Sequence, residues 1–348
     1  MTRPATLKDV AEAAGVATTT VARVVNKTGF VSEETRASVL KAVEKTGYRV
    51  NSLAQSLKRN RSFVIGHLLR SVIPNPFYLQ VARGVEEVAH ARGYTVLTLN
   101  VQGEAEAERR GIETFLNWRS DALIFTTPID EKNVEYAVKC RVPVVQVERP
   151  RSPIGHHITV RNYAGALAAM QHLIDLGHRH IAYVGAAPGQ QRNDLADYVE
   201  RERFGAYEDA LRAIGSYRGD LVLFGEPYSI GSATAQGHGY DATRQLLARA
   251  DVPTAILTSN DILAAGALQA IHEAGLRVPD DLSVIGFDDT LAAYLSPLLT
   301  SVSLPARRLG MAAAELVIDG LEDATLPKQQ HLQFDAELIL RRSTAVPR

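Results

Sequence analysis

The sequence predicts an α/β fold with a small helical headpiece at the N-terminus, followed by two lobes built on parallel sheets. Apolar residues between residues 6 and 47 recur at the spacing of short helices. From residue 62 onward, short apolar runs alternate with longer amphipathic stretches. This alternation is typical of parallel strands covered by helices. A chain of 348 residues is long enough for more than one domain.

The first predicted helix begins after Thr6. A threonine can cap a helix, and Asp9, three residues later, can complete a capping box. One face of the helix is then formed by Leu7, Val10, Ala11 and Ala14. Gly15 ends the helix.

A second helix is predicted from about residue 17 to 25 and a third from Ser32 to Gly47. The second helix ends at Asn26 or Gly29. The inward positions of the two helices are Val21, Val24, Val25, Val39, Leu40 and Val43. Two short helices joined by a tight turn and braced by a third form a helix-turn-helix. A small helical bundle without a partner is the alternative.

Charge separates the two possibilities. Residues 1–62 carry eleven Lys and Arg against five Asp and Glu, a net charge of +6, whereas the remainder carries 27 against 34, a net charge of −7. A basic head on an acidic body indicates a polyanionic partner, and neutralised phosphates supply most non-specific affinity for DNA.

We expect the second helix to enter the major groove of DNA. Thr18, Thr19 and Arg23 lie opposite its valine face, and threonine and arginine can read base edges. Thr20 and Lys27 are placed for phosphate contacts, which orient a protein without reading sequence. The predicted DNA-binding set also includes Thr6 and Asn26.

The first sixty residues resemble a known family. The stretches "TLKDVAEAAGVATTTVARVVN" and "VSEETRASVLKAVEKTGYRVNSLAQSLKRNRS" are similar to the headpiece and hinge of the lactose-repressor (LacI/GalR-type) family of bacterial transcription regulators. The resemblance implies a headpiece over 1–49, a hinge helix and linker over 50–61 that folds on operator DNA, and a core over 62–348. It also implies that Leu57, beside Lys58, wedges into the minor groove and kinks the duplex.

In the core, polar side chains follow several predicted strands. They are Asn75, Glu148, Arg203, Asn260, Asp261, Asp288 and Asp289, and Phe77 and Tyr78 stand beside the first of them. Open α/β sheets bind ligands at the carboxyl ends of their strands. Carboxylates, amides and a guanidinium suit a small polyhydroxylated or heterocyclic ligand, and an aromatic side chain can pack on a ring face. Each residue taken singly could instead cap the following helix.

The resemblance continues through the core in "LIDLGHRHIAYVG", "TSNDILAAGALQAIHEAGLRVPDDLSVIGFDD" and "SPLLTSVSLPARRLG", so that it covers nearly the whole chain. It implies a two-lobed fold like that of periplasmic binding proteins, in which the strand "LLTSVSLP" (298–305) crosses between lobes. It also implies effector contacts at Phe77, Glu148, Arg203, Asn260 and Asp288. Asn75 and Tyr78 complete the predicted effector site, and Tyr228 is a candidate aromatic contact.

Rival chemistries have weaker support in the sequence. "GHGYDA" (237–242) matches a dinucleotide-binding fingerprint, but a polar loop precedes it where a strand is required. The histidines at 172, 178 and 180 lack a Cys or carboxylate partner at metal-ligand spacing. Adjacent Asp288 and Asp289 would diverge after a strand, which disfavours an acid/base pair. The single cysteine, Cys140, can form no internal disulfide and is expected to be a buried small hydrophobe.

These observations predict a ligand-responsive repressor, not an enzyme, that binds a palindromic operator as a homodimer and has a sugar, or less often a nucleobase, as effector. No cofactor or metal is predicted. Since the N-terminus lacks an apolar leader and no apolar run could span a membrane, we expect a soluble cytoplasmic protein without a membrane partner. A sugar-binding protein or an enzyme with a vestigial head is the alternative, and the sequence leaves inducer and co-repressor both open.

Overall fold

The computed structural model describes residues 5–26, 28–48, 61–70, 75–149, 154–186, 198–225, 235–323 and 329–348. Internal contacts divide the chain into two units, Met1–Ser62 and Phe63–Arg348, and each is considered by itself. Four residues singled out from the sequence, Lys27, Leu57, Lys58 and Tyr228, lie outside the described residues.

The described residues of the first unit form three helices, as the apolar spacing predicts: α1 (Leu7–Ala14), α2 (Thr18–Val25) and α3 (Glu33–Thr46). Their shared core consists of Val10, Ala11, Val21, Val24, Val39 and Ala42. The valines of α2 contact both neighbouring helices through this core, so the predicted helix-turn-helix is confirmed.

The ends of these helices follow from local side chains. The Asp9 backbone N–H donates to Thr6 Oγ1 at 3.4 Å, and the Thr6 backbone N–H donates to Asp9 Oδ2 at 2.7 Å, which is the predicted capping box. Ser32 caps α3 by accepting from the Thr35 N–H. Gly15 and Gly47 end α1 and α3 in the left-handed region, with φ of 68° and 65°.

One inward position of α3 was predicted wrongly. Leu40 is 54% exposed, and the buried positions are Val39 and Ala42. Successive helical residues are rotated by about 100°, so the face that contains Val39 and Ala42 turns Leu40 toward solvent.

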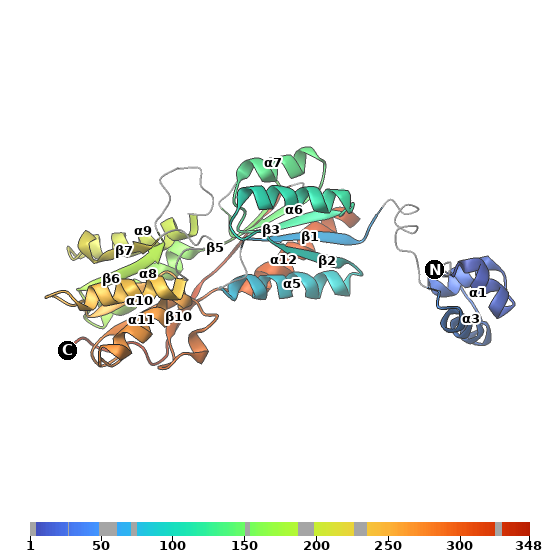
Figure 1. Ribbon diagram of the computed structural model, residues 1–348. Coiled ribbons are helices and arrows are strands. Elements are labelled where there is room, and N and C mark those ends of the chain that lie inside the picture. The colour runs from blue at the N-terminus through green and yellow to red at the C-terminus, as the bar shows by residue number, and fades with distance from the viewer. Residues whose placement is uncertain are drawn as a thin grey trace. The chain divides into compact units, whose positions relative to one another are not determined.

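In the second unit, lobe 1 is built on a six-stranded sheet in the order β11-β5-β4-β3-β1-β2, with every neighbouring pair parallel. The strands are β1 (Val64–Leu69), β2 (Thr95–Asn100), β3 (Ala122–Thr126), β4 (Val144–Val147), β5 (His156–Val160) and β11 (His331–Phe334). Helices α5 (Phe77–Ala91) and α12 (Ala306–Glu322) cover one face, and α6 (Ala105–Asn117) and α7 (Glu131–Lys139) cover the other (Figure 1).

Lobe 2 repeats the plan with the order β12-β10-β9-β8-β6-β7, in which only the β10–β12 pair is antiparallel among the strands described. Its strands are β6 (Ile181–Ala186), β7 (Val222–Gly225), β8 (Ala255–Thr258), β9 (Ser283–Asp288), β10 (Thr300–Ser303) and β12 (Glu337–Ile339). Its helices are α8 (Asn162–Asp175), α9 (Tyr198–Ala213), α10 (Ala235–Leu247) and α11 (Asp261–Glu273), with 3₁₀ turns at Gly219–Leu221 and Ala292–Tyr294.

Alternate residues of the strands enter different cores, which shows that both faces of each sheet are covered. In β6, Ile181 and Tyr183 join the core that contains Tyr207 of α9, whereas Ala182 and Val184 join the core that contains Leu263 of α11. Side chains of a strand alternate between faces, so strands covered on both sides read as continuous apolar runs.

The chain passes between the lobes three times: after β5 into α8, after β10 into α12, and between β11 and β12. The strand 298–305 was predicted to cross between the lobes, but its central part is β10, which pairs with β9 and β12 inside the lobe 2 sheet. The chain passes to lobe 1 only after this strand, where α12 begins. The C-terminal α12 and β11 therefore return to lobe 1, and these elements, together with β5 and β12, were not assigned from the sequence.

In the described part of the chain, none of the helices combines the length and apolarity that a membrane span needs.

Glycines allow two helix pairs to approach closely. A Cβ at Gly84 of α5 would lie 2.0 Å from the Arg307 carbonyl oxygen of α12, and a Cβ at Gly266 of α11 would lie 2.0 Å from the Gln236 carbonyl oxygen of α10. Both distances are well inside van der Waals contact, so these two positions require glycine.

Candidate functional site

Helix α2 presents the residues that were predicted to read DNA bases. Thr18, Thr19 and Arg23 are exposed, whereas Val21 and Val24 on the opposite side are buried. A surface of hydroxyls and one guanidinium on a short exposed helix can donate hydrogen bonds to base edges and to phosphates.

The turn that follows α2 returns to the same surface. The Thr28 N–H donates to the Arg23 carbonyl at 2.9 Å, and a Cβ at Gly29 would lie 3.7 Å from Arg23 Cδ. Thr20 and Asn26 are half-buried, and Thr6 is exposed but uses its hydroxyl on Asp9 Oδ2 at 2.7 Å. The predicted DNA-binding residues of α2 and the turn after it therefore lie near Arg23. The hydroxyl of Thr6, in contrast, serves to cap α1.

Arg203 of α9 is at the centre of a buried polar cluster in the second unit. It is 5% exposed, and its Nη2 lies 3.1 Å from Asp288 Oδ1. Its Nε donates to Asn162 Oδ1 at 3.1 Å and its Nη1 to the Ser259 carbonyl at 2.5 Å. The guanidinium carbon lies 3.9 Å from the centre of the Phe287 ring, so both the edge and the face of the group are held.

Asp288 joins this cluster to lobe 1. It ends β9 with a φ of 91°, a left-handed conformation that is uncommon for a non-glycine residue and occurs at functional sites. Its Oδ2 accepts from Asn75 Nδ2 at 2.8 Å, a hydrogen bond between the lobes. Asn75 Oδ1 in turn accepts from the Phe77 N–H at 2.9 Å. The predicted residues Asn75, Arg203 and Asp288 are therefore in one connected network.

Glu148 follows β4 and is also buried, with a φ of 56°. Its carboxylate accepts from the Val160 N–H at 2.9 Å and from Asn162 Nδ2 at 3.1 Å. Burial raises the pKa of Glu148 to about 7 against the opposing effects of these donors and of Arg203. Glu148 connects to Arg203 through Asn162.

Two aromatic side chains stand at the start of α5. Phe77 is buried and Tyr78 half-buried, and their ring centres lie 5.6 Å apart in an edge-to-face arrangement. Burial raises the pKa of Tyr78, and the nearby charges of Asp288 and Glu148 raise it further. The charge of Arg70 and a hydrogen bond with Thr127 lower it. The tyrosine therefore lies close to the polar cluster.

For Asn260 the structure shows the capping role that was the alternative. Its Oδ1 accepts from the Ile262 and Leu263 N–H groups at 3.1 and 2.9 Å, which caps α11. Asp261 is buried against the Ser301 hydroxyl and the Leu291 N–H, and burial raises its pKa to about 7.

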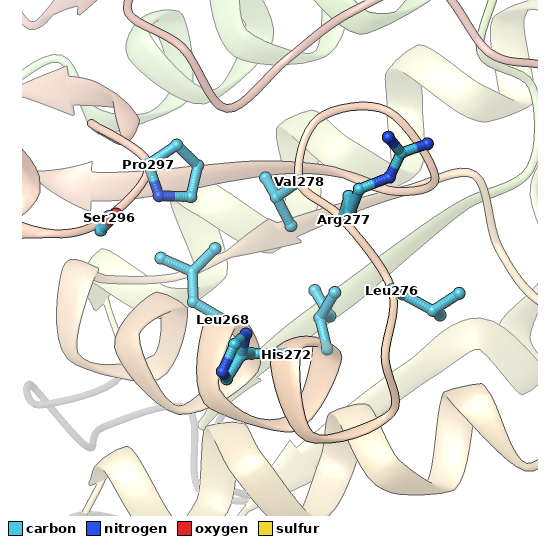
Figure 2. Close-up of a pocket in the computed structure, with 8 residues that line it drawn as sticks. Leu268, His272, Leu276, Arg277, Val278, Ser296 and Pro297 are labelled. Carbon is cyan, nitrogen blue, oxygen red and sulfur yellow. The ribbon is translucent and has the colours of Figure 1, made fainter.

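A separate hollow of about 320 Å³ lies in lobe 2, where the end of α11 faces the loops on either side of β9 (Figure 2). Leu268 and His272 line it from the helix and Pro297 from the loop before β10. None of the residues predicted to contact an effector lines this hollow.

Comparisons with known proteins agree with both the helix-turn-helix of the first unit and the two-lobed fold of the second. Residues 6–51 match the family model of bacterial regulatory proteins, lacI family, and residues 170–344 match a periplasmic binding protein-like domain. The HTH-type transcriptional repressor PurR of Photobacterium profundum is 35% identical over 97% of this chain and 98% of its own. The chain belongs to the LacI family.

Other relatives extend the likeness along the whole LacI-family chain. The ribose operon repressor of Escherichia coli is 35% identical and covers 97% of this chain and 99% of its own. The structure of a lac repressor dimer bound to operator and the anti-inducer ONPF is 29% identical, with a TM-score of 0.82 over 99% of this chain and 100% of that chain. This protein is accordingly a DNA-binding transcriptional regulator, as predicted, and not an enzyme.

In this LacI-family core, sequence reasoning missed three residues of the polar cluster: Asn162, Glu200 and Ser259. Glu200 is 8% exposed, accepts from Ser259 Oγ at 3.0 Å, and has its pKa raised to about 7 by burial. The signal for Asn162 was its place directly after a strand, but β5 was itself not recognised. Glu200 lies within α9, and from the sequence a single buried acidic residue in a helix cannot be distinguished from a solvent-exposed one.

The structure also bears on the rival chemistries. The stretch 237–242 lies inside helix α10, so it has no strand-to-helix turn in which a dinucleotide could bind. His178 contacts Thr254 and the Ala345 carbonyl, and His172 contacts Thr344. Within the described residues no group of His, Cys, Asp and Glu could hold a metal ion.

Cys140 was expected to be buried but is exposed. It is the C-cap of α7 and therefore lies beyond the buried face of that helix.

Proposed function

We propose that this protein is a repressor that binds a palindromic operator as a homodimer and releases or tightens on it when a small sugar binds between the lobes. The observation that carries the proposal is the buried Asn75–Asp288–Arg203 network, because it draws on both lobes and offers donors and acceptors to one ligand.

In the DNA-binding part of the proposal, Thr18, Thr19 and Arg23 read base edges from the exposed side of α2. Thr20 and Lys27 contact phosphates. Three further residues complete the proposed DNA-binding set. Thr6 is the N-cap of α1, Asn26 is the C-cap of α2, and Lys58 belongs to the hinge segment. Leu57 enters the minor groove as an apolar wedge.

A homodimer is supported by the geometry of operator recognition. One headpiece reads a single half-site, so two headpieces on a two-fold axis read a palindrome and add their affinities. The lac repressor in the similar structure is a dimer bound to operator. We assign residues 1–49 to the headpiece, 50–61 to the hinge helix and linker, and 62–348 to the effector-binding and dimerisation core. Because a repressor acts on DNA, we include a cytoplasmic location in this proposal.

A sugar is the effector that the cluster favours. Asp288 and Glu148 can accept from hydroxyls, Asn75 and Arg203 can donate to them, and Phe77 or Tyr78 can pack on an apolar ring face. We keep Asn260 as a further effector contact in addition to its role as the cap of α11. Among similar proteins are the ribose operon repressor and an Enterococcus faecium regulator with bound ribose, 25% identical with a TM-score of 0.67. We therefore take D-ribose as the first candidate and a nucleobase as the second.

The test is a binding titration with fluorescent DNA from the region upstream of neighbouring genes. A repressor binds a palindrome there with an affinity that falls steeply with salt, since bound phosphates release counterions. A panel of D-ribose, other sugars and nucleobases is then screened by thermal shift, and each stabilising ligand is added to the complex. A protein that binds a sugar but shows no salt-dependent affinity for a palindrome would be a sugar-binding protein with a vestigial headpiece, which contradicts the proposal.

A further inference from the structure

Asn162 occupies the point where the chain passes from lobe 1 to lobe 2. It is the first residue of α8, two positions after the end of β5. Its exposed fraction is 0%, which is unusual for asparagine and requires that its amide be satisfied by protein groups.

Both ends of that amide are used, and the partners come from different lobes. Nδ2 donates to Glu148 Oε2 of lobe 1 at 3.1 Å and to the Val160 carbonyl at 3.3 Å. Oδ1 accepts from Arg203 Nε of lobe 2 at 3.1 Å. One rigid amide plane thus fixes the distance between an acid of one lobe and the guanidinium of the other.

We propose that Asn162 is a positioning residue that couples Glu148 in lobe 1 to Arg203 in lobe 2. Because it is fully buried, it acts through these two neighbours and does not touch an effector itself. The expected effect of Asn162 on effector binding rests on the proposed function. The coupling of Glu148 to Arg203 through Asn162 does not depend on it.

The coupling has a direct physical basis. Arg203 uses Nε on Asn162, Nη1 on the Ser259 carbonyl and Nη2 on Asp288. Loss of the first contact leaves the buried Nε–H without its acceptor and removes the hydrogen-bonded path from Glu148 to the guanidinium. Hydrogen bonds in series polarise one another, so a change of charge at Glu148 alters the acceptor strength of the Asn162 oxygen that Arg203 contacts.

The charge on Glu148 depends on several groups around it. Those that act on it are Asn162, the Val160 N–H, Arg203, Asp288, Tyr78 and Tyr198. The donors and Arg203 lower the pKa of Glu148, whereas burial and the charge of Asp288 raise it. Removal of the Asn162 donor must therefore move the titration of Glu148 to higher pH.

Asn133 provides a matched control. It is 6% exposed, and its Nδ2 donates to Glu108 Oε2 at 3.0 Å and to the Ala105 carbonyl at 2.8 Å. These are the same kinds of contact as those of Asn162 Nδ2, but all three residues belong to lobe 1. Loss of this amide has a similar structural cost without breaking a link between lobes.

The first test needs no ligand. The Arg203 Nε–H signal and the Glu148 carboxyl signal are followed by NMR of the full chain from pH 5 to 9, with Arg203→Lys and Glu148→Gln used for assignment. All variants carry Glu200→Gln, because Glu200 also acts on Arg203 and burial raises its pKa to about 7. In this background we expect the Arg203 signal to follow the Glu148 titration, both without a further change and in Asn133→Ala. In Asn162→Ala the Glu148 midpoint should rise and the Arg203 response should fall to less than half.

Asn162→Asp is the second variant, because it preserves the shape and the acceptor for Arg203 but removes the donor to Glu148. It too should raise the Glu148 midpoint. An Arg203 response in both variants equal to that of the parent would overturn the proposal.

The second test uses D-ribose as the probe in calorimetric titrations. Loss of a buried hydrogen bond to a charged group costs enough to lower affinity about tenfold in Asn162→Ala, whereas Asn133→Ala should stay within about twofold of the parent. Equal affinities for the two variants would contradict the inference. If the parent itself does not bind D-ribose, the effector assignment is wrong and the NMR comparison alone decides the role of Asn162.

Discussion

Arg23 illustrates at the residue scale how an exposed side chain acquires a role from the helix that carries it. The valines of α2 are buried against α1 and α3, so the opposite side of a short helix must face outward. We expect Arg23→Ala to lower affinity for the true operator by roughly ten- to a hundredfold and to relax discrimination at one base pair.

The measurement for Arg23 is a titration against the operator, single-base variants of it and random DNA. Lys27→Ala, a predicted phosphate contact, serves as the comparison because it should weaken all sequences about equally. If Arg23→Ala lowered specific and random affinity by the same factor, Arg23 would not read a base.

Glu200 makes the second prediction at this scale, on the pH dependence of stability. Burial raises its pKa from 4.5 to about 7, so the folded protein binds this proton more tightly than the unfolded chain. The associated stability is fully present below pH 4.5 and is lost as the pH rises through about 7. Glu148 and Asp261 act in the same direction.

We therefore expect Glu200→Gln to remove a decline of ~1–3 kcal/mol in the free energy of unfolding between pH 5 and 8. The effect is measured as the difference between the parent and variant profiles, because buried histidines with a lowered pKa, such as His67, act in the opposite direction in both proteins. Urea unfolding of the parent and the variant at several pH values measures the effect. Glu86→Gln, at an exposed position of α5, is the control and should leave the profile unchanged. A Glu200→Gln profile parallel to that of the parent would show that Glu200 is ionised throughout.

At the scale of elements, two glycines in helices are predicted to respond oppositely to alanine. A Cβ at Gly266 would lie 2.0 Å from the Gln236 carbonyl oxygen, so Gly266→Ala must push α10 and α11 apart and should destabilise the protein by ~1–3 kcal/mol. A Cβ at Gly205 of α9 meets no atom within 4 Å, and Gly205→Ala should stabilise by ~0.5–1 kcal/mol through helix propensity. Thermal and urea unfolding test the pair, and a loss of stability in both variants would contradict the packing argument.

The hinge segment carries a second prediction for an element. Leu57, which lies outside the described residues, is flanked in sequence by Ser56 and Lys58, and such a polar context does not suit burial in a core. Leu57→Ala should retain the melting temperature of the parent while lowering operator affinity and the DNA bend angle. A circular-permutation gel measures the bend, and an unchanged angle would remove the wedge.

At the scale of the whole molecule, effector and operator must affect each other equally. Coupling free energy is reciprocal, so the factor by which D-ribose changes operator affinity equals the factor by which operator changes D-ribose affinity. Asp288→Ala and Arg203→Ala should lower D-ribose affinity roughly ten- to a hundredfold, since each leaves a charged partner unsatisfied.

Operator titrations of both variants with and without D-ribose test this coupling. If the sugar is an inducer, the variants should keep operator binding and lose the response. If it is a co-repressor, they should lose tight binding because the competent state is no longer selected. Variants that respond as the parent does would place the effector site elsewhere.

The sequence by itself determined the features that depend on neighbouring residues. The caps at Thr6 and Ser32, the glycine stops and the inward valines could be predicted because a helix end needs only local donors and acceptors. The apolar runs of the parallel strands were visible for the same reason, since strands buried on both faces are continuous apolar segments. The positions of Asn75 and Asp288 after predicted strands indicated a common site. Arg203 was expected at such an end too, but it lies inside α9.

Only the tertiary structure decided the contacts between residues far apart in the chain. Asn162 follows β5, a strand that was not recognised from the sequence, and Glu200 carries no local pattern. Their roles arise when β5, α8 and α9 come together around Arg203. The return of β11 to lobe 1 pairs His331 with His157, a register that depends on the whole sheet. Asn260 was an effector candidate by its position after β8, and the structure shows that its side chain also caps α11, because a buried helix start must satisfy its first N–H groups.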